Sequence, residues 1–172
     1  AFKSKGEGAL GSELEKLELQ AGWSRALDPW FNVRAGIRQD VRPRPARTHA
    51  LLAIEGLAPY WFEVEGELFL SHKGEVTARA EANYDQRITQ RLIVQPAAEV
   101  NVSAQDIPEL ALGSGFTSIE MGLRLRYEMV REFAPYVGIH WERKLGGTAR
   151  YARMHDEEIG GLRFVAGLRM WF

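Results

Sequence analysis

The stretch IEMGLRLRY, residues 119–127, alternates apolar side chains with polar or small ones at a period of two. The apolar side chains fall on every second position and are Ile119, Met121, Leu123, Leu125 and Tyr127. Successive side chains of a β-strand point to opposite faces, so the pattern predicts a strand with one apolar face and one charged face. The charged face carries Glu120, Arg124 and Arg126.

The same alternation recurs along the chain in segments bounded by turn residues, whereas helical spacing is scarce. Strands are predicted near residues 2–9, 17–24, 31–38, 48–56, 62–70, 76–85, 92–103, 119–127, 134–143 and 162–172. A count of about ten is even and lies in the range of outer-membrane barrels. The prediction is therefore an all-β fold, a transmembrane antiparallel up-and-down β-barrel of about ten strands.

Length and composition narrow the class of protein further. A chain of 172 residues is expected to form one domain, so residues 1–172 are predicted to be the barrel domain itself. A formal net charge of -1 leaves no basic field for nucleic acid, and the absence of cysteine excludes a disulfide scaffold, a thiolate metal site and a cysteine nucleophile. No stretch approaches the roughly 18 to 20 consecutive apolar residues of a transmembrane helix, whereas barrel strands need only alternate apolar residues.

The predicted connections and the aromatic residues favour a membrane barrel. Longer polar connections, which include residues 40–47, 105–115 and 143–161, alternate with short links, as in outer-membrane barrels with short periplasmic turns. Both termini are then expected on the periplasmic side. Aromatic residues beside the short links are expected to form one ring at the membrane interface: Trp30, Phe31, Tyr60, Trp61, Phe62, Tyr84, Phe133, Tyr136, Trp171 and Phe172. The alternative is that they fill the core of a soluble β-sandwich.

The second face of the predicted strands carries charges of both signs, which would be costly in an apolar core unless they were paired. A barrel of about ten strands is narrow, so its interior side chains nearly fill it. We therefore predict a polar, plugged lumen that is held by ion pairs between an acidic and a basic set. These sets are Glu63, Glu65, Glu67, Glu81 and Glu120, and Arg34, Arg38, Arg79, Arg124 and Arg126.

Several longer strings stand out along the chain: SRALDPWFNVRAGIRQD (24–40), GLAPYWFEVEG (56–66), TQRLIVQP (89–96), RLRYEMVREFAPYVGIHWERKLGGTA (124–149) and RFVAGLRMWF (163–172). Together they resemble the copper resistance protein B (CopB) family of bacterial outer membranes. The resemblance implies an outer-membrane barrel that binds copper ions and takes part in copper tolerance, homeostasis or transport. It also implies outer-membrane lipids, copper and periplasmic copper-handling proteins as partners. The family typically carries a Met- and His-rich segment ahead of the barrel, and we expect this chain to represent the barrel without that segment.

The candidate copper ligands are few, because the chain has only four His and four Met. Copper(I) favours thioether sulfur and copper(II) favours imidazole. Met154 and His155 lie in the last long loop, His49 near the outer rim, and His140 has inward parity. Sites with few ligands on a mobile loop are expected to bind weakly. A histidine among lumen charges can equally belong to a hydrogen-bond network, and the outward parity of Met121 and Met170 predicts contact with lipid.

An enzyme is the competing class. The nearby acid–histidine pairs are His140 with Glu142 and His155 with Asp156, and neither comes with a serine of recognisable spacing. We therefore expect that the protein is not an enzyme. A barrel hydrolase is the less favoured alternative. A structural or lipid-binding outer-membrane barrel remains the other alternative.

Overall fold

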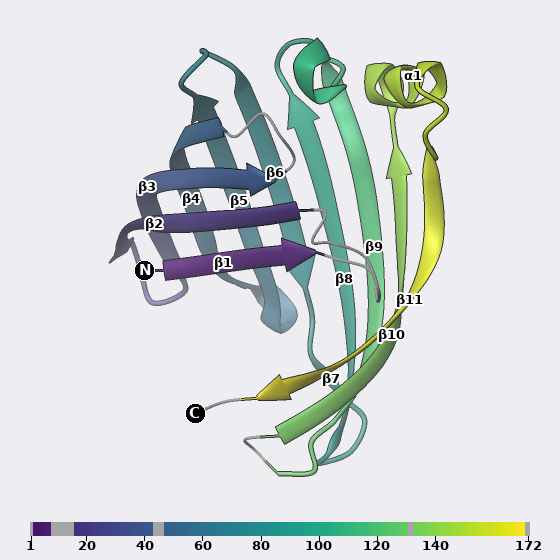
Figure 1. Ribbon diagram of the computed structural model, residues 1–172. Helices are drawn as coiled ribbons and strands as arrows, with labels where there is room; N and C mark the ends of the chain where they lie inside the picture. Colours follow the sequence, from purple (N-terminus) through teal and green to yellow (C-terminus); the bar gives the residue numbers. More distant parts are fainter. Residues whose placement is uncertain (1, 8–15, 43–46, 131–132, 171–172) are drawn as a thin grey trace.

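The computed structural model describes residues 2–7, 16–42, 47–130 and 133–170 (Figure 1). The strands are β1 (Phe2–Glu7), β2 (Lys16–Ala26), β3 (Phe31–Arg42), β4 (Arg47–Ala58), β5 (Phe62–Ser71), β6 (Val76–Asn83), β7 (Gln86–Arg87), β8 (Leu92–Ser103), β9 (Gly115–Tyr127), β10 (Phe133–Lys144) and β11 (Gly160–Met170). The helical elements are the 3-10 turns η1 (Pro59–Trp61) and η2 (Pro108–Leu110) and the helix α1 (Gly146–Met154).

All strands belong to one antiparallel sheet in which each strand pairs with its neighbours along the chain, in the order β1-β2-β3-β4-β5-β6-β8-β9-β10-β11. The two-residue β7 pairs with β8 beside this path. The prediction of an all-β, up-and-down sheet of about ten strands is therefore confirmed. The sheet curls through most of a barrel, but among the described residues β1 pairs with β2 and β11 with β10, so the two edges do not meet (Figure 1).

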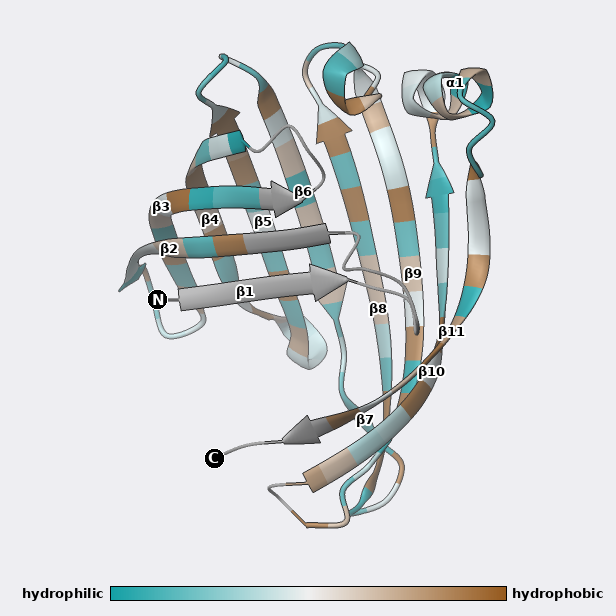
Figure 2. Ribbon diagram, in the orientation of Figure 1, coloured by the Kyte–Doolittle hydropathy of each residue, from teal (hydrophilic) through white to brown (hydrophobic). Residues whose placement is uncertain are grey.

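The two faces of the sheet differ as the period-two pattern predicts. Side chains of β4 alternate between buried and exposed from Arg47 to Ile54. Many exposed positions on the convex face are apolar, and Leu123 and Leu168 are 45% and 56% exposed. Figure 2 shows the resulting alternation of hydrophobic and hydrophilic bands along the strands. A single curled sheet with an apolar outer face excludes the two-sheet sandwich.

Leu51, Ala53 and Phe69 form a small buried apolar cluster on the inner face of β4 and β5. Phe69 has the same parity as Glu67 on β5, so an aromatic ring lies on the face that otherwise carries charges. The guanidinium of Arg38 lies 4.3 Å above the centroid of this ring. The inner face is therefore packed and polar, and not an apolar core.

The connections at the two ends of the sheet differ in length and content. At one end, the Asp28 carboxylate accepts hydrogen bonds from the backbone N–H groups of Trp30 and Phe31 at 2.7 and 2.8 Å, which closes a short turn. At the other end lie the η2 loop and α1 (Figure 1). The helix lies in the expected long connection 143–161, for which the sequence pattern predicted no helix. Among the described residues, no helix has both the length and the apolar character needed to cross a membrane.

Most of the expected aromatic ring is in place at the short-turn end. Trp30, Tyr60 and Trp61 are exposed, and Trp30 and Trp61 meet edge to face with ring centroids 6.4 Å apart. The prediction is wrong for Tyr136, whose ring lies on the inner face beneath the Arg124 guanidinium at 5.7 Å. Tyr136 shares one face of β10 with Ala134 and His140, so its side chain points inward although the residue lies near the turn. Trp171 and Phe172 lie outside the described residues.

Candidate functional site in the charged lumen

The strand register places glutamates directly opposite one another across consecutive strands of the inner face. The row runs through β4, β5, β6, β8, β9 and β10 and consists of Glu55, Glu65, Glu81, Glu99, Glu120 and Glu142. Like charges that face each other across strands destabilise a sheet. Cationic or hydrogen-bonding partners are therefore needed beside this row.

Arg34 on β3 brings a positive charge close to three carboxylates of the inner face. Its guanidinium lies 2.6 Å from Glu65, 3.0 Å from Glu67 and 3.6 Å from Glu55. Only 5% of the Arg34 side chain and 2% of the Glu67 side chain are exposed, so this contact is screened very little by solvent. Charge-assisted hydrogen bonds of this kind are the strong ones.

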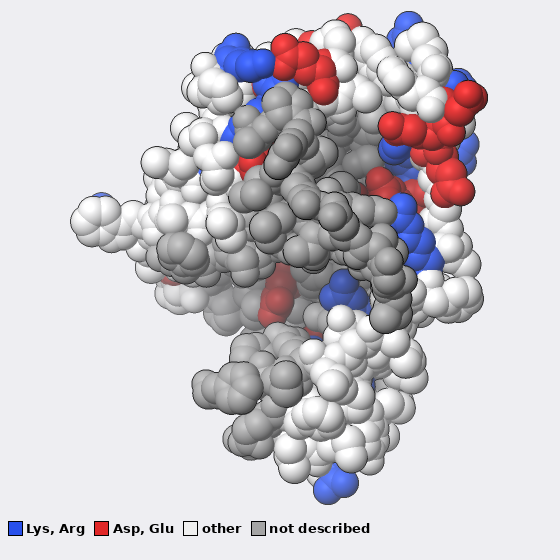
Figure 3. All heavy atoms as spheres, viewed as in Figure 1, with Lys and Arg blue, Asp and Glu red and all other residues white. Residues whose placement is uncertain are grey.

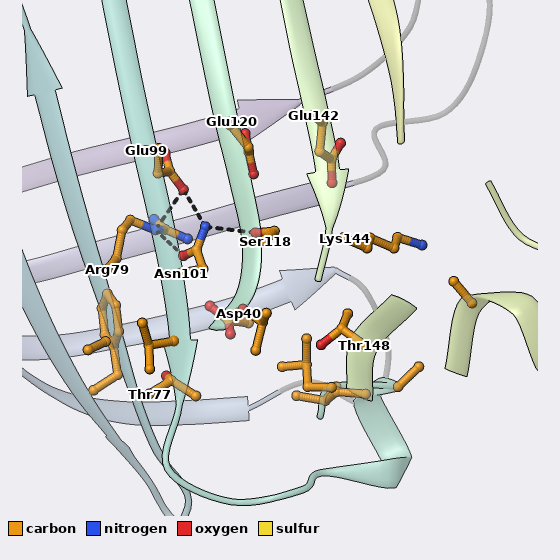
Figure 4. A pocket seen from close by; sticks show the side chains of 18 of the residues that line it. Asp40, Thr77, Arg79, Glu99, Asn101, Ser118, Glu120, Glu142, Lys144 and Thr148 are labelled. Atoms are coloured by element: carbon orange, nitrogen blue, oxygen red, sulfur yellow. Dashed lines mark hydrogen bonds and ion pairs between the residues drawn. The ribbon is translucent and has the colours of Figure 1, made fainter. Parts of the chain in front are cut away.

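Arg79 on β6 continues the chain of charges toward β8. It lies 3.7 Å from Glu67 and 3.1 Å from Glu99, and its Nε donates to the side-chain oxygen of Asn101 at 3.2 Å. Asn101 in turn donates to Ser118 on β9 at 3.2 Å (Figure 4). Alternating cations and carboxylates thus cross the inner face from β3 to β8.

The remaining residues of the two predicted sets lie in different surroundings. Arg38 contacts Asp40 at 2.6 Å, Arg126 contacts Asp85 at 2.8 Å, and Glu81 accepts a hydrogen bond from Asn83 at 2.8 Å. Glu63 is exposed and forms no ion pair with a described residue. Arg124 is also exposed and meets the Tyr136 ring.

His140 on β10 faces Glu120 on β9. The two side chains approach to 3.3 Å between Nε2 and a carboxylate oxygen, and both are largely buried. Glu142 follows His140 on the same face of β10 and is the register partner of Glu120. The imidazole and the Glu120 carboxylate offer one nitrogen and one oxygen donor to a cation.

The other predicted ligands lie apart from this pair. His49 is buried on β4 with its Nδ1 3.6 Å from Asp40, beyond hydrogen-bond distance, and its ring meets Phe69 edge to face. Met154 ends α1 and is 64% exposed, and His155 follows with its Nδ1 2.9 Å from the carbonyl oxygen of Tyr151. In the part of the chain that the structure describes, no three His, Asp or Glu side chains are gathered so as to hold a metal ion.

A cavity of about 440 Å³ lies between the inner wall and the loops that carry η2 and α1. Glu99, Glu120 and Glu142 line its wall, and Asp40 lies across from them (Figure 4). Figure 3 shows acidic and basic side chains at the end where α1 lies and inside the hollow, while much of the flank is uncharged. The cavity is the space in which a small solute can meet the row of carboxylates.

Several residues that line this cavity were not among the predicted site residues. For some of them, the alternation along the strand already predicts a side chain on the inner face. Asn101 and Ser118 are register partners on the inner faces of β8 and β9. Arg47, only 1% exposed, binds Glu75 and, at 2.9 Å, Glu109. The partners of Arg47 lie in loops, so strand periodicity could not identify them.

The chain matches the family described as "Copper resistance protein B precursor (CopB)" over residues 1–172. It is 45% identical to copper resistance protein B of Escherichia coli and 43% identical to the copper resistance protein B homolog of Pseudomonas syringae pv. tomato, in both cases over 171 residues and 99% of this chain. It spans 57% and 58% of the lengths of these two relatives.

Two solved structures share the fold at 12% sequence identity. The NanC porin superposes with a TM-score of 0.64 over 91% of this chain and 79% of its own, and the KdgM porin with 0.56 over 91% and 76%. At this identity the likeness shows the fold alone, a porin-like antiparallel barrel sheet. The match along the whole sequence and the two curated relatives show that the chain belongs to the copper resistance protein B (CopB) family.

Proposed function

We propose that this chain is an outer-membrane barrel that binds copper ions weakly in its lumen and takes part in moving or buffering copper at that membrane. The family and its names support a role in copper resistance. The apolar convex face and the exposed aromatic side chains at one end suit a bilayer and its interface. Outer-membrane lipids and copper are then its immediate partners, periplasmic copper-handling proteins are further ones, and the chain itself has no catalytic role.

The observation that carries the proposal is the His140–Glu120 contact at 3.3 Å, with Glu142 beside it on the wall of the cavity. Copper(II) accepts imidazole nitrogen, and a carboxylate beside the imidazole supplies charge for a divalent cation. Two or three such donors, without a complete cage, suit a site that a moving ion must leave again.

We propose that copper reaches this wall from the loop end of the barrel, where α1 lies. Met154 and His155 offer a thioether and an imidazole at the exposed end of α1, where copper in either oxidation state could first bind. His49 offers a further imidazole on the inner face of β4. These positions and His140 then form a series of separate weak contacts, not one site.

Copper titration of the purified chain in detergent tests the proposal. Copper(II), or copper(I) under a reductant, is added to the parent and to three variants: His140→Ala, Met154→Ala with His155→Ala, and Met121→Ala. The first two are expected to bind more weakly, and the copper(II) spectrum of His140→Ala should lose imidazole nitrogen coupling. Met121 points outward from β9 and is the matched control, since its variant should bind as the parent does.

Two results would contradict these sites. If all three variants bind copper as the parent does, the lumen and loop positions are not ligands and the proposal fails for this chain. If Met121→Ala alone abolishes binding, copper meets the outer face instead.

A further inference from the structure

Two segments from different loops cover one end of the lumen cavity. Leu110 and Leu112 come from the β8–β9 connection that contains η2, and Thr148 and Ala152 come from α1. All four line the cavity, opposite the wall that carries the carboxylates. Figure 1 places both segments at the same end of the sheet. We call residues 104–114 together with α1 the roof.

The two parts of the roof are joined by buried contacts. The backbone N–H of Gly113 donates to the Thr148 hydroxyl at 3.0 Å, and both residues are buried. The backbones of Gly113 and Gly147 lie so close that a Cβ added to Gly147 would come within 2.8 Å of the Gly113 Cα. This packing leaves no room for a side chain or water between them, so the two parts move together.

The contacts that hold the roof to the neighbouring β5–β6 turn and to β4 are of another kind. Glu109 in η2 lies 2.5 Å from the ammonium of Lys73 in the β5–β6 turn and 2.9 Å from the guanidinium of Arg47 on β4. The Glu109 side chain is 56% exposed. Gln105, at the base of the loop, donates to the carbonyl oxygen of Gly74 at 3.1 Å and accepts from the backbone of Val76.

We propose that the roof opens and closes over the cavity as one unit, and that the contacts of Glu109 with Lys73 and Arg47 are its latch. The Lys73–Glu109 pair is exposed on both sides, so it contributes little and is screened by salt, and Glu109 is also the exposed partner of the buried Arg47. The Gly113–Thr148 contact is buried and insensitive to salt. The latch is therefore the connection that breaks first. Gln105 holds the base of the loop and acts as the hinge. The inference uses only contacts within the chain and is independent of copper binding.

The chain has no cysteine, so a single introduced thiol can report on opening. Ser118→Cys places the thiol in the cavity beneath the roof, and the change in its rate of labelling by a charged, water-soluble thiol reagent when the latch is altered measures how far the roof controls access. In this background, Glu109→Lys is expected to raise the labelling rate about two- to fivefold, the range for one exposed ion pair. High salt should raise the parent rate in the same direction.

Controls separate the latch from a general effect of charge. Glu158→Lys makes the same change at an exposed site that forms no ion pair with a described residue, and it should leave the labelling rate unchanged. Lys73→Glu combined with Glu109→Lys restores an ion pair of reversed sign and should bring the rate back toward the parent value. A Gln90→Cys reporter in the exposed link before β8, outside the roof, should label at one rate in all variants.

Thr77→Cys on β6 is a second cavity reporter, for use if Ser118→Cys does not fold. Equal labelling of the cavity thiol in the presence and in the absence of Glu109→Lys would overturn the inference, since the latch would then not control access. Equal acceleration by Glu158→Lys would overturn it as well. Neither measurement involves copper. The proposal of an opening roof can therefore be wrong while the copper proposal is right, and the copper proposal can be wrong while the roof proposal is right.

Discussion

The guanidinium of Arg34 on β3 reaches across the inner face of β4 to lie 2.6 Å from a carboxylate oxygen of Glu65 on β5. β4 lies between these two strands in the sheet, and the register places the small side chain of Ala53 in line between Arg34 and Glu67, so the arginine can extend over it. The same guanidinium reaches Glu67 at 3.0 Å. One guanidinium thereby lies between two carboxylates that share the inner face of β5.

Arg34→Ala should therefore be strongly destabilising. Removing one partner from a buried ion pair leaves an uncompensated charge, at a cost of about 3 to 5 kcal/mol in the free energy of unfolding. Urea unfolding in detergent, followed by tryptophan fluorescence, measures this change. Arg25→Ala, at an exposed position of β2, is the control and should stay within about 0.5 kcal/mol of the parent. Similar stability of the two variants would show that Glu65 and Glu67 do not depend on Arg34.

Period-two alternation was sufficient to predict the strands and the direction of most side chains. It placed Leu123 outward on β9 and Arg34 inward on β3, as the structure has them. It could not predict which inward charges meet, because Arg34 and Glu65 lie on strands that are not neighbours. Such contacts depend on the register of three consecutive strands and on the small Ala53 side chain between Arg34 and Glu67, and the alternation within one strand does not contain that register.

The helix α1 was missed although the sequence carries a weak signal for it. Its buried residues are Thr148, Ala149 and Ala152, a spacing of one helical turn within a short polar segment. The small residues at its start, Gly146 and Gly147, favour a loop when they are judged by propensity alone. Contact between Gly147 and Gly113 in another loop stabilises the helix, and the sequence order does not reveal that contact.

Leu123→Lys tests whether the convex face meets lipid. Leu123 lies in the middle of β9 and is 45% exposed. A lysine on the lipid face near the middle of a bilayer costs about 2 to 4 kcal/mol, falling to about 0 to 1 kcal/mol near the interface. Folding into lipid vesicles, measured by urea titration, should show the larger cost for Leu123→Lys. Gln90→Lys, in the exposed link before β8, is expected to show the smaller one, and equal costs would argue against a membrane-facing β9.

Acid should loosen the contact of η2 with the β5–β6 turn. The hydrogen bond from Lys73 and its positive charge hold the pKa of the Glu109 carboxyl below the ordinary value of 4.5, with a further contribution from Arg47. Because the folded pKa is depressed, the contribution of this contact is complete above 4.5 and is lost as the pH falls through the lower, folded value. The hydrogen-exchange protection factors of residues 105–114, which are corrected for the slower intrinsic exchange in acid, should therefore fall in that acidic window.

Glu109→Gln supplies the control for the acid effect. The amide keeps the shape of the side chain but has no carboxyl to titrate, so the exchange of residues 105–114 should already be fast at neutral pH. The further fall of its protection factors in acid should be smaller than in the parent. If the variant and the parent show the same dependence on pH, another group is responsible.

Removing Arg34 and Arg79 together should turn the lumen into a leak. Their side chains cross the inner face from β3 to β8 and hold Glu65, Glu67 and Glu99 in place. A narrow barrel whose interior side chains pair with one another leaves little water-filled space, so the parent should show small conductance in planar bilayers. Arg34→Ala with Arg79→Ala vacates the volume of two guanidinium groups and leaves carboxylates that must be hydrated, so conductance should rise severalfold and favour cations. Arg25→Ala with Arg87→Ala removes the same charge from exposed positions and should not change the conductance. A parent that already conducts like an open porin would show that these ion pairs do not plug the lumen.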